Sequence, residues 1–363
     1  MVSPQSIGRQ LRLLIVRPSA LGDVSRTVPA LVTLRASLPE AHIDWLVHES
    51  FVDVVAHHPA LDGVVPFPRD RIGAMFRSPR LAREALSWAR RLSRNRYDMA
   101  IDLQGLLRSG LFTWLTRAPR RIGFANAREF AHRAYNHRHA IDVSLHTVDR
   151  MLALLEAEGF TPRPDMRLYL GEGDRSWLDT YLNHHLGGGD APFATLAPTA
   201  RWRCKCWPIE HYVEVARRLL DSGRVGDRIV VLAGPGERED VRPLLGQLGD
   251  RAIFASTSVG QMMALLSRTA LLVCNDSGPL HIAVGFDRPI VTVFGLTDPA
   301  LVGPYGRRET VVRAPQVDPA AIASYRRHRD DQSLIAQVSV EAVWKKVIEQ
   351  FDGHHRSEAD VTR

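Results

Sequence analysis

The sequence predicts an α/β fold of two parallel sheets, each covered by helices on both faces. Three observations support this prediction. The chain has 363 residues, which suits two domains better than one. Short apolar runs alternate with longer amphipathic stretches, as in consecutive βα units. The alternation is interrupted once, at the proline-rich segment 161–165, and then begins again.

The first half of the chain opens with an apolar run at 11–16, followed closely by Pro18 and Gly22. Such a short, bounded run is typical of a buried parallel strand. A helix is expected at 23–38. It should end before Pro39, because a proline disfavours helical backbone at the residue that precedes it. Further strands are expected at 43–47, 64–66, 99–103 and 120–124, and further helices at 79–94, 106–116 and 146–158.

The second half of the chain repeats the pattern. A helix at 174–185 is expected to end at the glycine run 187–189. Strands are expected at 193–198, 228–234, 271–276 and 289–295, and helices at 208–222, 237–248, from 278 onward and at 339–351. The predicted domains are 1–165 and 166–350, both Rossmann-like, with a ligand cleft between them. Residues 351–363 are predicted to be a polar tail without regular structure.

The charge balance is basic, with 47 Lys and Arg against 40 Asp and Glu, which gives a net charge of +7. Arginines are most crowded between residues 69 and 138. A basic face attracts anions such as phosphorylated lipids, and it allows peripheral contact with the inner face of the cytoplasmic membrane. A solvated arginine-rich surface explains the same pattern. No basic motif interleaved with aromatic residues is present, so no nucleic-acid partner is expected.

Several other functional classes are excluded by composition. No apolar run approaches the roughly 20 residues of a membrane span, and the N-terminal segment lacks a signal-peptide pattern, so a cytoplasmic location is expected. Three scattered cysteines (Cys204, Cys206 and Cys274) form neither a disulfide framework nor a zinc motif. No zinc or redox site is therefore expected, and the sequence predicts no cofactor. The absence of G-x-G-x-x-G and Walker A patterns argues against NAD dehydrogenases and P-loop enzymes.

The segment R-P-S-A-L-G-D at 17–23 directly follows the first expected strand. Gly22 permits a tight turn and a close approach to a ligand. Asp23 is then expected at the start of a helix, exposed at the top of the sheet. A carboxylate there can accept a proton from a substrate hydroxyl as a general base. Capping of the helix is the alternative role for Asp23.

The segment N-D-S-G-P-L-H at 275–281 follows a later expected strand. The first N–H groups of a helix are unpaired, and the helix dipole favours negative charge, so this turn suits a diphosphate. Pro279 has no N–H, and the expected donors are therefore the peptide groups of Ser277, Gly278, Leu280 and His281. A well-capped helix without a ligand is the alternative interpretation.

The loop 199–208 is expected to face the same crevice. Arg201, Arg203 and Lys205 fall within five positions and would neutralise a departing diphosphate. The turn A-G-P-G-E at 233–237 then presents Glu237, which suits ribose hydroxyls, although Gly-Pro-Gly is also ordinary turn chemistry. The segment D-L-Q-G at 102–105 is expected to line the cleft, either as a wall or as a contact to a second substrate.

Taken together, these motifs resemble glycosyltransferase family 9, the ADP-heptose:lipopolysaccharide heptosyltransferases. The matching motifs occur in the family's order and extend over residues 11–315. They are R-P-S-A-L-G-D (17–23), D-L-Q-G-L (102–106), R-I-G-F (121–124), K-C-W-P (205–208), A-G-P-G-E (233–237), N-D-S-G-P-L-H-I-A (275–283) and F-G-L-T-D-P (294–299).

The resemblance implies a GT-B fold and an inverting, metal-independent transfer of heptose from ADP-heptose. It implies that Asp23 is the base and that Lys205 contacts the diphosphate. The remaining residues that it implies for the nucleotide sugar are Thr199, Arg201, Glu237 at the ribose, Asp276 at the donor sugar, and Ser277, Gly278, Leu280 and His281 at the phosphates.

The resemblance also implies an acceptor, a phosphorylated lipid-linked glycan of the lipopolysaccharide inner core, bound by the N-terminal domain. Gln104, Arg120 and Arg121 are the residues expected to contact it, because arginine forks suit phosphate and carboxylate groups. Two alternatives remain open at this stage. One is an enzyme that uses a UDP- or GDP-sugar, and the other is a non-catalytic two-domain binding protein for an anionic ligand.

Overall fold

The computed structural model describes residues 10–188, 191–314, 317, 322 and 325–361. The chain divides into two compact units, Met1–Tyr169 and Leu170–Arg363. The predicted linker at 161–165 belongs to the first unit, where the Arg163 N–H donates to the Thr33 hydroxyl at 2.9 Å. Among the described residues, no helix combines the length and the apolar character needed to cross a bilayer.

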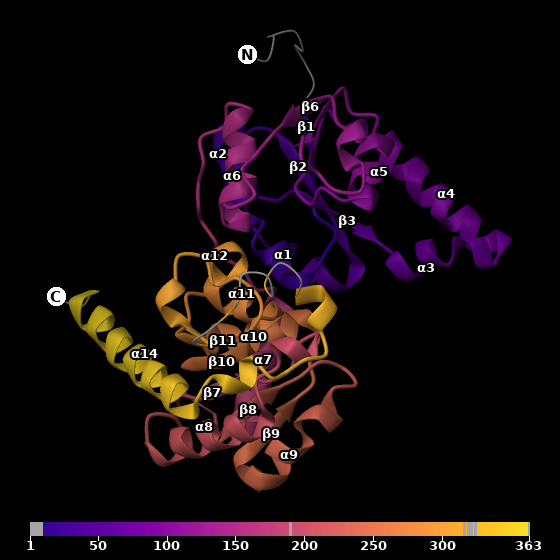
Figure 1. The fold of residues 1–363 in the computed structure, drawn as a ribbon. Helices are drawn as coiled ribbons and strands as arrows, with labels where there is room; N and C mark the ends of the chain where they lie inside the picture. Colours follow the sequence, from indigo (N-terminus) through magenta and orange to yellow (C-terminus); the bar gives the residue numbers. More distant parts are fainter. Residues whose placement is uncertain (1–9, 189–190, 315–316, 318–321, 323–324, 362–363) are drawn as a thin grey trace. The chain divides into compact units, whose positions relative to one another are not determined.

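The first unit contains a six-stranded parallel sheet with the order β3-β2-β1-β4-β5-β6 (Figure 1). The chain moves outward from β1 to β3 and then returns to β4 on the other side of β1. This reversal creates a switch point between β1 and β4, where open α/β sheets bind ligands. The strands are β1 Arg12–Val16, β2 His42–His48, β3 Gly63–Phe67, β4 Met99–Asp102, β5 Arg120–Phe124 and β6 His137–His139.

Helices cover both faces of this sheet. Helices α2 and α6 pack together on one face, and α4 and α5 pack together on the other (Figure 1). Trp88 of α4 and Phe112 of α5 join Leu14 and Phe67 in the core on the second face. The helices are α1 Leu21–Ser25, α2 Val28–Ser37, α3 Arg69–Gly73, α4 Pro79–Arg94, α5 Leu107–Leu115 and α6 Thr147–Ala157, with 3-10 turns η1 Glu49–Val54, η2 Met75–Arg77 and η3 Ala131–Ala134.

The second unit has the same topology, with the order β12-β11-β10-β7-β8-β9 and all neighbours parallel. Its switch point lies between β7 and β10. The strands are β7 Ala194–Ala197, β8 Ile229–Leu232, β9 Ala252–Ala255, β10 Leu271–Asn275, β11 Ile290–Phe294 and β12 Val311–Arg313.

The helices of the second unit pack in two groups: α8 contacts α9 and α14, whereas α10 contacts α7 and α11. Trp207 and Tyr212 are among the largest side chains buried in the core of this unit. The helices are α7 Glu172–Leu186, α8 Ile209–Asp221, α9 Arg238–Leu248, α10 Val259–Arg268, α11 Gly278–Gly285, α12 Pro299–Val302 and α14 Val340–Val361, with 3-10 turns η4 Arg203–Lys205, η5 Gly249–Arg251, η6 Arg308–Thr310, η7 Tyr325–His328 and η8 Ile335–Gln337.

The structure differs from the sequence prediction in a few elements. The helix predicted at 23–38 is two helices, because the ring of Pro29 would clash with the Ser25 carbonyl in a continuous helix. Strands β6, β9 and β12 and helices α3, α10 and α12 were not predicted. The strands are short and lie at or near the sheet edges, whereas α10 has a Ser258–Gln261 capping box that the sequence analysis overlooked.

The predicted polar tail at 351–363 is wrong over its described part, because α14 continues to Val361. Phe351 is buried in the core of the unit, and Asp352 pairs with Arg224 at 2.8 Å. These contacts carry the helix past the predicted end, and no proline follows to stop it. Residues 362–363 lie outside the described part of the chain.

His58 holds the end of the first unit in place. Its ring packs edge-on against Tyr169, with 4.9 Å between the ring centroids. Its Nδ1 accepts a hydrogen bond from the Ala60 N–H at 3.1 Å. Burial lowers the pKa of His58 from 6.5 to about 4, although Asp165 nearby opposes the change. The folded protein therefore keeps this imidazole neutral.

We expect acid to destabilise the protein through His58. Because its pKa is lower in the folded than in the unfolded chain, stability is retained above pH 6.5 and declines as the pH falls toward 4. At pH 5 the loss is about 2 kcal/mol. Denaturant unfolding of the wild type and of His58→Asn, at pH 7 and pH 5, measures it: the difference between the two proteins should change by this amount. The same substitution at the exposed neighbour His57 should change nothing, and an equal response from both would contradict the prediction.

Candidate active site

The loop after β1 holds Asp23 at the third residue of α1. Its Oδ1 lies 2.6 Å from Arg26 and 3.2 Å from Arg17, and its Oδ2 accepts from the Ala20 N–H at 3.2 Å. Asp23 therefore closes the start of α1, as the capping interpretation predicts. One third of its side chain (33%) remains exposed, so the carboxylate is also accessible to a ligand.

Arg17 connects the loops on the two sides of the switch point. Its guanidinium is buried and donates to the carbonyl of Leu103, which follows β4. The same guanidinium contacts Asp23 in the loop after β1. The position of the Asp23 carboxylate is thus tied to both central strands.

The loop 102–105 is organised by Asp102, which is fully buried. Its Oδ1 accepts from the N–H groups of Gln104 and Gly105 at 2.8 and 3.0 Å, and its Oδ2 accepts from the Tyr135 hydroxyl at 2.6 Å. Burial raises the pKa of the Asp102 carboxyl, against the effect of these hydrogen bonds. A Cβ on Gly123 would lie 2.4 Å from the Tyr135 ring, which explains the glycine in the R-I-G-F motif. Among the described residues, the buried Gln104 Oε1 has no hydrogen-bond partner.

Arg120 and Arg121 do not lie at the same edge of the sheet as Gln104. They begin β5, and Arg120 is in register with Met99 at the amino end of β4. Arg120 forms an ion pair with Glu158, and Arg121 donates to the carbonyls of Ala118 and Ala134 at 2.7 and 2.8 Å. The sequence analysis expected these arginines at the acceptor because their guanidinium groups suit phosphate. They lie at the amino end of β5, whereas Gln104 follows the carboxyl end of the parallel strand β4.

Three other arginines gather toward the carboxyl edge of the first sheet, and the sequence analysis missed their grouping. Burial lowers the pKa of Arg150, and repulsion by Arg17 and Arg128 lowers it further. The Arg150 guanidinium also lies 5.4 Å from the centroid of Phe124, the last residue of β5. Arg128 is fixed nearby, since its N–H donates to the Gly105 carbonyl at 3.0 Å. Mutual repulsion of this kind favours the binding of an anion.

In the second unit, Asn275 organises the loops at the carboxyl edge. Its side chain is fully buried at the end of β10. Its Nδ2 donates to the Pro198 carbonyl at 2.7 Å, and its Oδ1 accepts from the Trp207 N–H and the Tyr212 hydroxyl, both at 3.0 Å. Asn275 thereby fixes both ends of the loop 198–207 against the central strand. The sequence analysis included Asn275 in a motif but assigned it no role.

Lys205 and Asp276 lie together, as expected from the prediction that their loops face the same crevice. The Lys205 Nζ is 2.5 Å from the Asp276 Oδ2, and both side chains are largely buried. The Thr297 hydroxyl, which follows β11, donates to the same oxygen at 2.8 Å. The indole of Trp202 lies 5.6 Å from Nζ. Thr297 is a further residue that the sequence analysis did not single out, although it belongs to the F-G-L-T-D-P motif.

The turn into α11 begins directly after Asp276. Ser277 is its N-cap, and among the described residues its buried Oγ has no hydrogen-bond partner. Gly278 is partly exposed, whereas the side chains of Leu280 and His281 are buried. A ligand at this turn would therefore meet peptide groups rather than the side chains of Leu280 and His281.

A cavity of about 490 Å³ lies within the second unit beside these loops. Thr199, Arg201 and Glu237 contribute to its lining, so three of the predicted nucleotide-sugar residues share one cavity. Lys205, Asp276 and the turn 277–281 are not part of this lining. The Glu237 Oε2 accepts from the Gly234 N–H at 2.6 Å, which orients the carboxylate within the turn 233–237. The cavity has the size of a small-molecule site. Its polar lining also includes Arg203, Glu210, Asp240 and Gln332.

Comparisons with known proteins identify this architecture. Two six-stranded parallel sheets of this topology in one chain form the GT-B fold, as in the solved Escherichia coli heptosyltransferase WaaC with ADP. That structure aligns with a TM-score of 0.74 and 28% sequence identity, over 94% of this chain and 100% of that one. The WaaC structure with ADP-2-deoxy-2-fluoro heptose aligns with a TM-score of 0.72 and 28% identity, over 93% of this chain and 99% of that one.

Sequence relatives agree with the structural match. The model of glycosyltransferase family 9 (heptosyltransferase) matches residues 85–327. Lipopolysaccharide heptosyltransferase 1 of Escherichia coli is 31% identical over 84% of this chain and 94% of its own length, and its counterpart in Pseudomonas aeruginosa is 31% identical over 82% of each. The chain therefore belongs to glycosyltransferase family 9. It is a glycosyltransferase, and the family resemblance found in the sequence is confirmed.

We expect the Lys205–Asp276 pair to contribute strongly to stability. In Lys205→Met the buried Asp276 carboxylate loses its cation, which should cost on the order of 3 kcal/mol. Thermal or denaturant unfolding measures this loss, and Lys205→Met combined with Asp276→Asn should recover much of it. Lys346→Met, which removes an exposed pair with Glu349 (2.6 Å apart), is the control and should cost less than about 1 kcal/mol. Equal effects of the two single substitutions would mean that burial of the Asp276 pair is unimportant.

Proposed function

We propose that this glycosyltransferase transfers heptose from ADP-heptose, with inversion, to an anionic lipid-linked glycan of the lipopolysaccharide inner core. The observation that carries the proposal is the Lys205–Asp276 ion pair, in a loop whose residues Thr199, Arg201 and Cys206 line a polar cavity together with Glu237. The chain is also 31% identical to lipopolysaccharide heptosyltransferase 1. The relatives solved with ADP and with a fluorinated ADP-heptose support the choice of donor.

The second unit would bind the donor. Glu237 would accept hydrogen bonds from the ribose hydroxyls, with Thr199 and Arg201 lining the same cavity. Asp276 would accept from the hydroxyls of the donor sugar. Lysine has three N–H donors, and one contact to Asp276 leaves others for the diphosphate.

The leaving diphosphate would be stabilised from two directions. Lys205 would supply the positive charge, and the peptide N–H groups at the start of α11, from Ser277 to His281, would add hydrogen bonds and the helix dipole. These groups are held before the reaction by Asn275 and Thr297, so little reorganisation is needed as charge develops.

The first unit would bind the acceptor at the carboxyl edge of its sheet. Arg17, Arg128 and Arg150 suit its anionic groups, since their mutual repulsion is relieved by a bound anion. Gln104 is half-buried in the same loop, and its side-chain amide can hydrogen-bond to a sugar hydroxyl. In this arrangement Arg120 and Arg121 have structural roles and do not touch the acceptor.

Asp23 would be the general base. It would take the proton of the acceptor hydroxyl as that oxygen attacks the anomeric carbon, on the face opposite the diphosphate. The new C–O bond forms as the bond to the diphosphate breaks, through a transition state with oxocarbenium character. Arg17 and Arg26 orient the carboxylate for this step. Transfer further requires the two units to bring the bound acceptor and donor together.

A cytoplasmic enzyme of this kind would meet its lipid-linked acceptor at the inner face of the cytoplasmic membrane.

Replacement of Asp23 tests the assignment of the base. In Asp23→Asn the turnover of heptose transfer should fall by about 10²–10⁴-fold, because the amide cannot accept the proton. The reaction is measured by mass spectrometry of the glycosylated acceptor, with ADP-heptose as donor. The affinity for ADP should not change, because Asp23 lies in the other unit.

Glu40→Gln, on an exposed turn of the first unit, is the control and should be fully active. Near-normal turnover of Asp23→Asn would place the base elsewhere. Transfer from UDP- or GDP-sugars but not from ADP-heptose would replace the proposed donor. Tight binding of a nucleotide sugar without transfer to any acceptor or release of its nucleotide would favour the non-catalytic alternative.

A further inference from the structure

Helix α5 exposes an apolar stripe that its packing does not explain. Leu107, Leu111 and Trp114 are spaced four and then three residues apart, so they lie on one face of the helix. Their side chains are 59%, 49% and 58% exposed. The opposite face, which includes Phe112, is buried against the sheet. A helix with apolar residues on both faces needs a second partner for the outer one.

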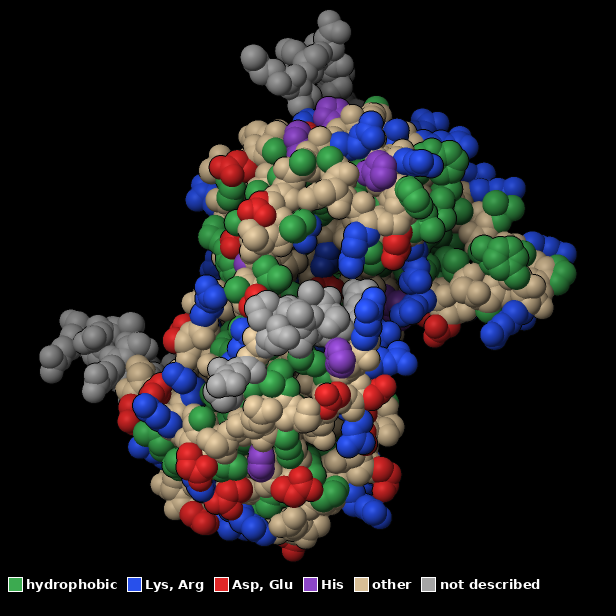
Figure 2. Space-filling model, viewed as in Figure 1, with side chains coloured by type: hydrophobic (Ala, Val, Ile, Leu, Met, Phe, Trp, Pro, Cys, Tyr) green, Lys and Arg blue, Asp and Glu red, His purple; other side chains and the backbone are tan. Residues whose placement is uncertain are grey.

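Neighbouring elements extend this stripe into a continuous surface. Leu86 of α4, which is 49% exposed, lines one groove together with Trp114. The Leu107 N–H donates to Glu129 at 3.1 Å, which brings the exposed Phe130 beside the start of α5. Hydrophobic side chains gather over this region of the first unit, bordered by Lys and Arg (Figure 2). We call Leu86, Leu107, Leu111, Trp114 and Phe130 the apolar surface.

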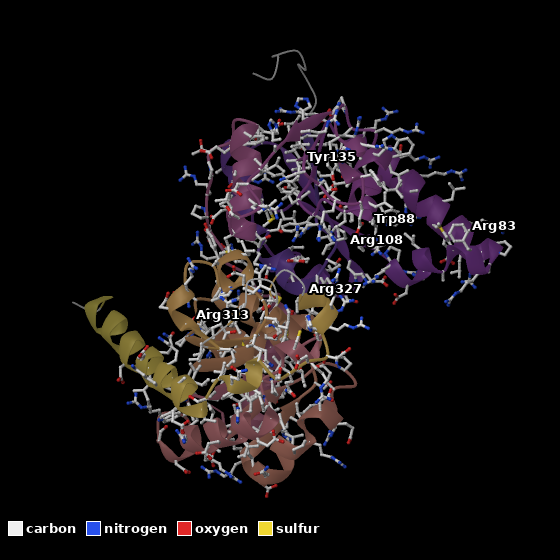
Figure 3. All side chains as sticks on the ribbon, in the orientation of Figure 1. Arg83, Trp88, Arg108, Tyr135, Arg313 and Arg327 are labelled. Carbon is white, nitrogen blue, oxygen red and sulfur yellow. The ribbon has the colours of Figure 1, made fainter. Side chains whose placement is uncertain are left out.

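Arginines surround the apolar surface. Helix α4 contains five of them and a single acidic residue, Glu84, which pairs with Arg80. Within the described part of the chain, no carboxylate pairs with the exposed Arg83, Arg90 and Arg94. Arg83 lies toward the outer end of α4, and Arg108 lies at the start of α5 (Figure 3). These positive charges are left without compensation inside the protein.

Two grooves bring the apolar and cationic side chains together. The groove between α4 and the end of α5 has a volume of about 670 Å³ and is lined by Leu86, Trp114, Arg90, Arg94 and Arg117. A second groove of about 580 Å³ lies between α3 and α5, where Leu111 lies beside Arg69, Arg77 and Arg108. Each groove therefore offers apolar contact next to guanidinium donors, the combination that a phospholipid with an anionic headgroup requires.

We propose that this surface docks the first unit onto an anionic phospholipid bilayer. Trp114 and the leucines insert at the level of the headgroups, where an indole is favoured, and the arginines bind the lipid phosphates. Charge complementarity selects this partner over a second copy of the chain. A symmetric dimer through the same surface would oppose arginine to arginine. The inference concerns a surface outside the residues assigned to the donor and the acceptor sugar.

Vesicle co-sedimentation of the full-length protein tests the proposal. The protein should bind vesicles that contain phosphatidylglycerol much more tightly than vesicles of phosphatidylcholine, and high salt should weaken binding because it screens the arginines. Combined replacement of Arg83, Arg90 and Arg94 by Gln should lower the affinity for the anionic vesicles by roughly 10–100-fold. Trp114→Ser should lower it by about tenfold without removing the salt dependence.

Matched controls keep the test specific. Replacement of Arg217, Arg242 and Arg251 by Gln, all in the second unit, removes the same charge and should leave vesicle binding nearly unchanged. Val143→Ser, at another exposed apolar residue (60% exposed), should also have little effect. Circular dichroism and ADP binding verify that each variant is folded. The assay contains no sugar substrate, so its result is independent of the proposed transfer reaction.

Three results would overturn the proposal. One is equal binding of the wild type to neutral and anionic vesicles. Another is an equal loss of binding in the second-unit controls. The third is concentration-dependent self-association that Trp114→Ser abolishes, in a protein that binds no vesicles, which would assign the surface to a second copy of the chain.

Discussion

A buried polar side chain at the end of a central strand holds the carboxyl-edge loops of each unit. Asp102 ends β4 and Asn275 ends β10, and these strands occupy equivalent positions beside the first strand of each sheet. Both side chains are fully buried, so their hydrogen bonds must be satisfied within the protein. Asp102 satisfies them with its own loop and Tyr135, and Asn275 with the loop after β7 and with α8. The positions of the neighbouring Gln104 and Asp276 follow from these bonds.

The charged side chains near Asp102 and near Asn275 are arranged differently. In the second unit, Lys205 and Asp276 neutralise each other, so the site is electrostatically satisfied before a nucleotide binds. In the first unit, burial lowers the pKa of Arg150, and repulsion by Arg17 and Arg128 lowers it further. An enzyme that transfers the sugar of a nucleotide sugar to an anionic acceptor, and releases the nucleoside diphosphate, would use both arrangements. One is a preorganised pocket for the leaving group, and the other is an excess of positive charge for the acceptor.

The first unit also bears the apolar surface, so the residues proposed for the acceptor and for the bilayer share one rigid sheet. The acceptor residues lie at the carboxyl edge, while Trp114 and Arg94 lie on helices that cover one face. Because the two sets of residues lie on different parts of the unit, the protein could bind lipid through the apolar surface while the carboxyl-edge loops bind the acceptor sugar. The arginines that crowd this part of the sequence therefore have two different roles. Arg120 and Arg121 form an ion pair and backbone contacts, whereas most of the exposed arginines of α4 carry charge that no carboxylate in the described part of the chain neutralises.

The sequence by itself determined the fold class, the family and most elements, because apolar periodicity and turn residues act locally and the motifs directly follow strands. It also grouped Lys205 with Asp276 correctly, since both follow neighbouring strands of one parallel sheet. Only the tertiary structure decided which side chains from different strands contact one another. It paired Thr297 with Asp276 and gathered Arg17, Arg128 and Arg150, and it put Arg120 and Arg121 at the opposite edge. Such pairings depend on strand order and on which end of a strand a residue occupies. Both are set by packing between segments distant in sequence, which local patterns do not encode.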